Sequence, residues 1–147
     1  MRILLTLFLT FSIFVVYGNA GNEEVLGKYL LETFETAVAK KNETQAIGLF
    51  DHRFKYKTIY NGHNTNMHLG LYVRTWMKYP IGLMPIFRFE SAHWNGSIFQ
   101  INWNYEERHN DVRMAIHVLF FAERKGKQFL FTLGEEVKSY SNMGKNV

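Results

Sequence analysis

The sequence contains no cysteine, which excludes disulfide cross-links and redox control. Stability must therefore come from packing, and the aromatic content of 16% supplies apolar area for a core. The chain also lacks a P-loop, a GxGxxG loop, a GxSxG elbow and an HExxH motif. These absences leave nucleotide, Ser-His-Asp and zinc chemistry without support.

Only one long apolar run is present, and it lies at the start of the chain. Met1-Arg2 is positive, residues 3–16 carry no charge, and Gly18-Asn19-Ala20 has the small residues that a signal peptidase requires. The run is shorter than the roughly 20 apolar residues that span a bilayer. We expect residues 1–20 to be a signal peptide, cleaved between Ala20 and Gly21. The mature chain is then secreted, with no membrane as a partner.

The mature chain is only mildly basic. Cleavage of the signal peptide removes Arg2. The mature chain then has 16 Lys and Arg and 13 Asp and Glu, a net charge of +3. The basic residues are not interleaved with exposed aromatics, so we expect no nucleic-acid partner. Two Asn-X-Ser/Thr sequons begin at Asn42 and Asn95, and each is a candidate N-glycosylation site in a secreted protein.

Three segments have the apolar spacing or end signals of helices. Apolar residues at steps of three and four predict a long first helix over 22–41. Capping-box spacing that starts at Asn42 predicts a shorter helix over 42–50. A third helix is predicted over 67–79, where Pro80 ends it.

Alternation with a period of two predicts strands. It begins at Arg53, with Phe54 and Tyr56 on one face and cations on the other, and a polar loop over 61–66 follows. Four more strands are predicted over 86–94, 98–106, 112–123 and 127–137, with a polar tail over 139–147. We expect a single domain over 21–138.

The alternation also predicts how these strands pair. A bulged loop over 95–97 aligns Phe89, Ser91 and His93 with Trp103, Ile101 and Phe99. A two-residue Lys125-Gly126 loop pairs Phe120 with Phe131, Val118 with Leu133 and Ala122 with Phe129. The opposite face, with His117, Leu119, Phe121, Leu130 and Thr132, is also largely apolar. A partner subunit is one way to cover it, which indicates a homodimer.

The order of these elements resembles the nuclear-transport-factor-2-like superfamily. The resemblance runs from about Glu23 to Val137 and rests on three stretches: Tyr29-Leu30-Leu31-Glu32-Thr33-Phe34, Ala46-Ile47-Gly48-Leu49-Phe50-Asp51 and Phe54-Lys55-Tyr56. The chain looks like the short secreted members of unknown function found in nematodes. The resemblance implies an α+β fold, a curved antiparallel sheet wrapped around a long N-terminal helix into a cone. Its order is helix-helix-strand-helix-strand-strand-strand-strand.

Acid–base chemistry has little support in the sequence. An isomerase of this superfamily is expected to carry an aspartate base on the first strand, where this chain has Lys57, Thr58 and Ile59. The two aspartates, Asp51 and Asp111, are interpreted as turn or loop residues. The histidines lack metal-ligand spacing, so no metal or other cofactor is expected.

We therefore expect a secreted, noncatalytic domain whose cone binds a small apolar ligand or is filled by side chains. The candidate cavity residues are Tyr29, Tyr56, Phe89, His93, Trp103 and Tyr105. One alternative is an isomerase or dehydratase that uses His93 with Tyr56 or Tyr29. A second alternative is a protein–protein interaction module that acts through the two-sided apolar strands.

Overall fold

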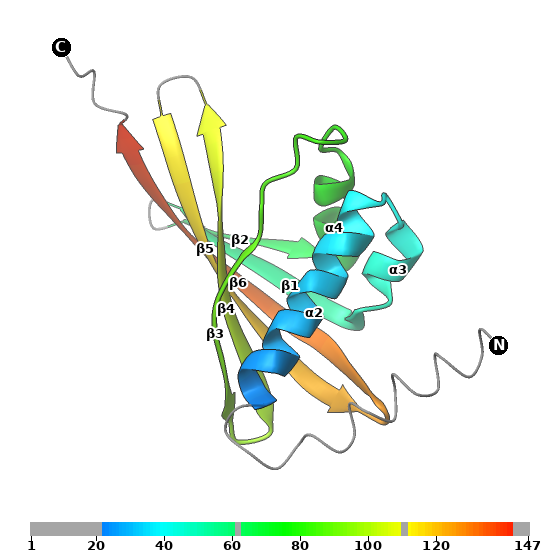
Figure 1. Ribbon diagram of the computed structural model, residues 1–147. Helices are drawn as coiled ribbons and strands as arrows, with labels where there is room; N and C mark the ends of the chain where they lie inside the picture. The colour runs from blue at the N-terminus through cyan, green and yellow to red at the C-terminus, as the bar shows by residue number, and fades with distance from the viewer. Residues whose placement is uncertain (1–21, 61–62, 110–111, 143–147) are drawn as a thin grey trace.

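The computed structural model describes residues 22–60, 63–109 and 112–142, and in these it places three helices on one side of a six-stranded sheet (Figure 1). In chain order the elements are α2 (Asn22–Ala39), α3 (Glu43–Ile47), β1 (Phe50–Tyr60), β2 (His63–His68), α4 (Leu69–Met77), β3 (Arg88–Asn95), β4 (Ile98–His109), β5 (Val112–Lys125) and β6 (Gln128–Asn142). The expected signal peptide and its cleavage site at Ala20 and Gly21 lie outside the described residues, as does Asp111.

The strand order is β2-β1-β6-β5-β4-β3. All neighbouring strands are antiparallel except β1 and β6, which run parallel, so the sheet is mixed and not wholly antiparallel as expected. The face toward the helices is called the inner face here, and the opposite one the outer face. No helix in the described ranges is long and apolar enough to cross a membrane.

α2 has the periodicity predicted for the long first helix. Its buried apolar side chains recur at short helical steps and lie over the inner face: Leu26, Leu30, Leu31, Phe34, Ala37 and Val38. Gly27 allows a close approach to β3, because a Cβ at this position would lie 2.5 Å from the Cβ of Ala92. A larger residue at position 27 would push the helix off the sheet.

Two glutamates of α2 reach the edge of the sheet. Glu23 accepts a hydrogen bond from the backbone N–H of Trp94 at 3.3 Å, and Glu35 accepts one from the N–H of Phe87 at 3.0 Å. β3 is an edge strand and Phe87 directly precedes it, so these donors have no strand on their outer side to bond. The helix thus protects the edge against pairing with another chain.

The two short helices are both capped, but only the cap of α3 was predicted, and the bounds of both helices differ from the prediction. The side chain of Asn42 accepts from the N–H of Gln45 at 3.0 Å, as a capping residue should. α3 ends at Ile47, however, and Phe50 already belongs to β1, so the prediction of a helix through Phe50 was wrong. His68 caps α4 by accepting from the N–H of Leu71 at 3.4 Å.

β1 follows the predicted alternation, with Phe54, Tyr56 and Thr58 buried. The prediction of a polar loop after β1 was wrong, because residues 63–68 form β2, which pairs antiparallel with β1. β2 is an edge strand whose side chains are mostly exposed. Because neither of its faces is buried, β2 does not need alternating apolar residues. The pattern that predicts a strand is therefore absent from its sequence.

The β3–β4 hairpin corrects the predicted register. Its loop has two residues, Gly96 and Ser97, and the positive φ of Gly96 (62°) suits the first position of a type II′ turn. The bulge lies inside the strand instead, between Phe89 and Ser91. Phe89 opposes Trp103 as predicted, but His93 opposes Gln100 and Ser91 opposes Asn102.

The β5–β6 hairpin departs from its predicted register in the same way. Its loop is Gly126-Lys127, with Gly126 at φ 63°. Ala122 opposes Phe131 and Phe120 opposes Gly134, since the register shifts between Phe121 and Ala122. The predicted pairs of Phe120 with Phe131, Val118 with Leu133 and Ala122 with Phe129 were wrong. β6 also continues to Asn142, past the domain boundary expected at 138.

The core between α2 and the sheet is a cluster of aromatic rings. Phe34 is fully buried at its centre. Five rings have centroids 5.3 to 6.3 Å from that of Phe34: Phe50, Tyr72, Trp76, Phe87 and Phe120. A domain without disulfides is therefore stabilised by dense aromatic packing.

Candidate functional site

The sheet register places three polar side chains in one row across the inner face. Trp103 on β4 opposes Val118 on β5, Val118 opposes Glu136 on β6, and Glu136 lies beside Thr58 on β1. Thr58, Trp103 and Glu136 are all buried. Three strands thus bring an indole, a carboxylate and a hydroxyl into the interior, and Val118 of β5 lies between the indole and the carboxylate.

Glu136 is the charged centre of this row and is only 4% exposed. Its Oε2 accepts a short hydrogen bond from the hydroxyl of Tyr56, and the Nζ of Lys138 lies 3.0 Å from its Oε1. Gly134 makes room for this arrangement, because a Cβ there would lie 2.5 Å from Cδ2 of Tyr56. The buried carboxylate is therefore compensated by one cation and one hydroxyl donor.

Four tyrosines lie close enough to the carboxylate to be affected by its charge. The ring of Tyr72 stacks on that of Tyr56 with 4.3 Å between centroids. Burial raises the pKa of Tyr56, Tyr72, Tyr79 and Tyr105 above the ordinary value, and the negative charge of Glu136 raises each pKa further. For Tyr79 the hydrogen bond that its hydroxyl donates to Glu107 contributes as well. All four hydroxyls are thus neutral near pH 7 and can donate hydrogen bonds.

Several polar atoms of this region have no protein partner. Among the described residues, Thr58 Oγ1, Tyr72 OH and Trp103 Nε1 are buried without a hydrogen bond, and Glu136 Oε1 has only its ion pair with Lys138. The indole of Trp76 acts to lower the pKa of Tyr72, against the larger effect of burial, but it does not form a hydrogen bond with the Tyr72 hydroxyl. Buried polar groups normally find partners, so this concentration of unpaired atoms is unusual.

Three of the six candidate cavity residues come together here. Tyr56, Trp103 and Tyr105 are buried on the inner face, and the rings of Trp103 and Tyr105 lie 5.6 Å apart. Phe89 is half-buried, opposes Trp103 and packs where Gly27 of α2 meets β3, three strands from Glu136 in the sheet order.

The other two candidates were wrong. Tyr29 is 47% exposed on α2. His93 is exposed and opposes Gln100, because the two-residue loop at Gly96 shifts this part of the strand by one residue relative to the prediction. An enzyme that uses His93 inside the cone is excluded by this placement.

Glu136 was missed because the predicted register puts Phe131 and Leu133 on the inner face, and alternation from them turns Glu135 inward and Glu136 outward. The register shift in the β5–β6 hairpin reverses this, and Glu135 instead forms a 3.2 Å ion pair with Lys57 on the outer face. Asp51 had been assigned to a turn after α3. It lies at the start of β1, where its carboxylate accepts from the N–H of Arg53 at 2.9 Å, and this bond lowers the pKa of Asp51.

No family model matches the sequence, and no curated protein matches it. Solved structures do resemble the fold. A nuclear transport factor 2-like protein of unknown function from Silicibacter pomeroyi is 11% identical over 84% of this chain and 100% of its own, with a TM-score of 0.64. One from Shewanella baltica is 7% identical over 84% and 97%, with a TM-score of 0.62.

A third solved structure, a ketosteroid isomerase-like protein from Erwinia carotovora atroseptica, is 8% identical over 79% of this chain and 95% of its own, with a TM-score of 0.56. At such identities the likeness concerns the fold alone and carries no activity with it. Together with the sheet order and the helices on its inner face, these likenesses establish that the chain has the nuclear transport factor 2-like fold.

Proposed function

We propose that the chain is a secreted, noncatalytic domain whose interior binds a small, mainly apolar molecule that carries a hydrogen-bond acceptor. The observation that supports this proposal is the presence of two unpaired buried donors on aromatic side chains, the hydroxyl of Tyr72 and the indole N–H of Trp103. An unpaired buried donor costs about 1–3 kcal/mol, which an acceptor on a bound ligand would recover. The aromatic rings around both donors favour an apolar body for that ligand.

The arrangement of Glu136 favours binding over catalysis. A catalytic base must be able to take up a proton from a substrate. Here one carboxylate oxygen already accepts from Tyr56 and the other is paired with Lys138. The carboxylate is thus engaged within the protein, and the donors that lack a partner are neutral groups.

Native mass spectrometry of the secreted protein tests this function. We expect a retained small molecule, and a loss of about tenfold or more in its occupancy in the Tyr72→Phe and Trp103→Phe variants, because each removes one donor and keeps an aromatic ring. Tyr29→Phe is the matched control, since it removes an exposed hydroxyl outside the cone. Full occupancy in both cone variants, or no retained molecule in the native protein, would contradict the proposal.

The same spectrum tests secretion and glycosylation, which we also propose. Asn42 and Asn95 are both exposed. The cap on α3 uses the side-chain oxygen of Asn42, so its amide nitrogen can carry a glycan while the cap persists. We expect the mass of a chain that begins at Gly21 with glycans attached. This mass should decrease after enzymatic removal of N-glycans.

Self-association through the outer face is a second proposal. Ile59 and Val137 are neighbours on β1 and β6 and are 43% and 54% exposed. Farther along the same face, beyond the ion pair of Lys57 and Glu135, lie half-buried apolar side chains of β5 and β6, including Leu119 and Leu133. Exposed apolar side chains gathered on one face are typical of an interface.

We expect the Ile59→Lys/Val137→Lys double variant to be monomeric in light scattering at concentrations where the native protein has twice the monomer mass. Two lysines would place charge in the apolar contact and repel those of the partner. Val25→Lys, a change at a 60% exposed site on α2, should leave the mass unchanged. A native protein that stays monomeric at every concentration would refute the dimer.

A further inference from the structure

The segment between α4 and β3 exposes an unusual amount of apolar surface. Among the described residues its Ile81, Leu83 and Ile86 are the most exposed large apolar side chains, at 84%, 71% and 70%. Single exposed apolar residues are common, but three within six residues form a patch. Residues 80–86 are called the apolar loop below.

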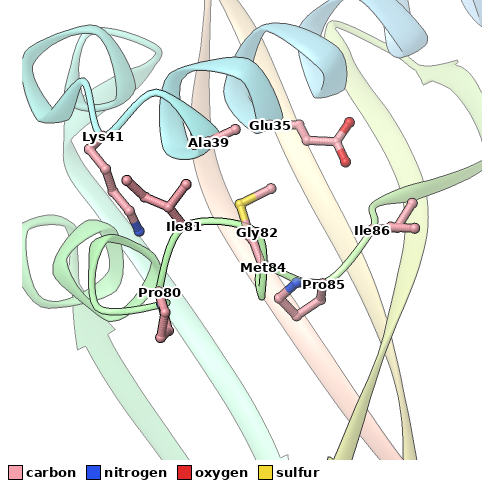
Figure 2. Close-up of a pocket in the computed structure, with 9 residues that line it drawn as sticks. All are labelled: Glu35, Ala39, Lys41, Pro80, Ile81, Gly82, Met84, Pro85 and Ile86. Atoms are coloured by element: carbon pink, nitrogen blue, oxygen red, sulfur yellow. The ribbon is translucent and has the colours of Figure 1, made fainter.

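The apolar loop is fixed on its inner side. Met84 packs against the hydrophobic core, and Figure 2 shows its side chain directed toward Ala39 of α2. A small pocket of about 220 Å³ lies between the loop and the end of α2. The positive φ of Gly82 (82°) allows the turn at the tip. The exposed side chains therefore project from a supported turn.

Lysines gather at the base of the apolar loop. The Nζ of Lys41 donates to the carbonyl of Met77 at 3.0 Å and to that of Tyr79, which ties the corner after α2 to the end of α4. This contact brings Lys40 and Lys78, both exposed, to the same end of the molecule.

Glu35 lines the pocket beside the loop, Glu107 contacts Tyr79 just before it, and both carboxylates are engaged with other groups. Glu35 accepts from the N–H of Phe87, and Glu107 accepts from the hydroxyl of Tyr79. The apolar loop therefore combines exposed apolar side chains at its tip with lysines at its base.

We propose that the apolar loop is a docking site for the surface of an anionic phospholipid bilayer. The side chains of Ile81 and Leu83 would enter the boundary between headgroups and acyl chains, while Lys40 and Lys78 face the anionic headgroups. A protein partner of ordinary affinity needs roughly 800 Å² on each side, and a projecting seven-residue loop offers much less. This proposal is independent of the cone ligand, and it departs from the sequence-based expectation of no membrane partner.

Vesicle sedimentation of the mature protein tests the proposal. We expect binding to vesicles of phosphatidylserine and phosphatidylcholine, weak binding to phosphatidylcholine alone, and release at high salt. Ile81→Ser/Leu83→Ser should weaken binding to the anionic vesicles by about tenfold or more, because two apolar side chains no longer insert. Lys40→Gln/Lys78→Gln should weaken it severalfold and reduce its salt dependence.

The matched control is Val25→Ser/Tyr29→Ser, which removes two exposed side chains from α2 far along the chain from the loop. It should bind anionic vesicles like the native protein, and all variants should keep the native unfolding midpoint. The proposal fails if the native protein does not bind anionic vesicles, or if the control loses as much binding as the loop variant. It also fails if the loop variant changes the mass in light scattering but not vesicle binding, since the loop would then contact protein.

Discussion

Replacing Phe34 with alanine is expected to destabilise the domain by about 3–5 kcal/mol, a large part of the roughly 5–15 kcal/mol that stabilises a typical domain. Phe34 is fully buried, and five aromatic rings would line the space it leaves. These rings belong to β1, α4, β5 and the segment before β3, and they cannot all move inward together. Equilibrium unfolding in urea measures the loss directly.

Tyr29→Ala, at an exposed position of the same helix, is the control for this experiment. It removes an aromatic ring from solvent-facing surface, so we expect a change within about 0.5 kcal/mol. A cost for Phe34→Ala no larger than that for Tyr29→Ala would mean that α2 does not pack on the inner face as described. A reduced secretion yield of Phe34→Ala alone would accompany the expected result.

The elements with strong apolar periodicity were predictable from the sequence. α2 has a buried stripe along its whole length and was assigned with nearly correct bounds. β1 alternates from Phe54 to Thr58 and was assigned too, although it begins at Phe50 and not at Arg53. β2 was not predictable, because an exposed polar edge strand is set by its pairing with β1 and not by its own side chains.

The strand registers were harder to predict than the strands. Both hairpins use a two-residue loop with Gly96 or Gly126 in its first position, and both have a register shift farther into the strands. The glycines indicate the two-residue loops, but the alternation of apolar and polar residues does not show where the register shifts lie. A shift of one residue exchanges the faces, which moved His93 outward.

Because of these register shifts, only part of the candidate site was predictable from the sequence. Tyr56 and Trp103 lie on strand segments whose faces were assigned correctly, and both reach the interior. Glu136 lies beyond the register shift in β6, so its burial follows from the tertiary structure alone. A glutamate in a strand whose other residues alternate between apolar and polar is ordinarily interpreted as solvent-facing.

Replacing Lys138 with methionine is expected to cost about 3–5 kcal/mol of stability, because it leaves the buried carboxylate of Glu136 without its cation. The methionine keeps much of the side-chain length, so the change removes charge more than packing. Lys127→Met, at an exposed hairpin position, is the matched control and should change stability by less than about 0.5 kcal/mol. Urea denaturation at neutral pH measures both variants.

The decisive measurement is the double variant Glu136→Gln/Lys138→Met. A neutral glutamine no longer needs a cation, and its side chain can still accept the hydrogen bond from Tyr56. We expect the double variant to recover most of the stability lost in Lys138→Met, which makes the two effects strongly non-additive. Additive losses would show that Lys138 acts through packing alone and that Glu136 is not held as a buried charge. Recovery would instead identify the pair as the charged centre around which any ligand in the cone must be accommodated.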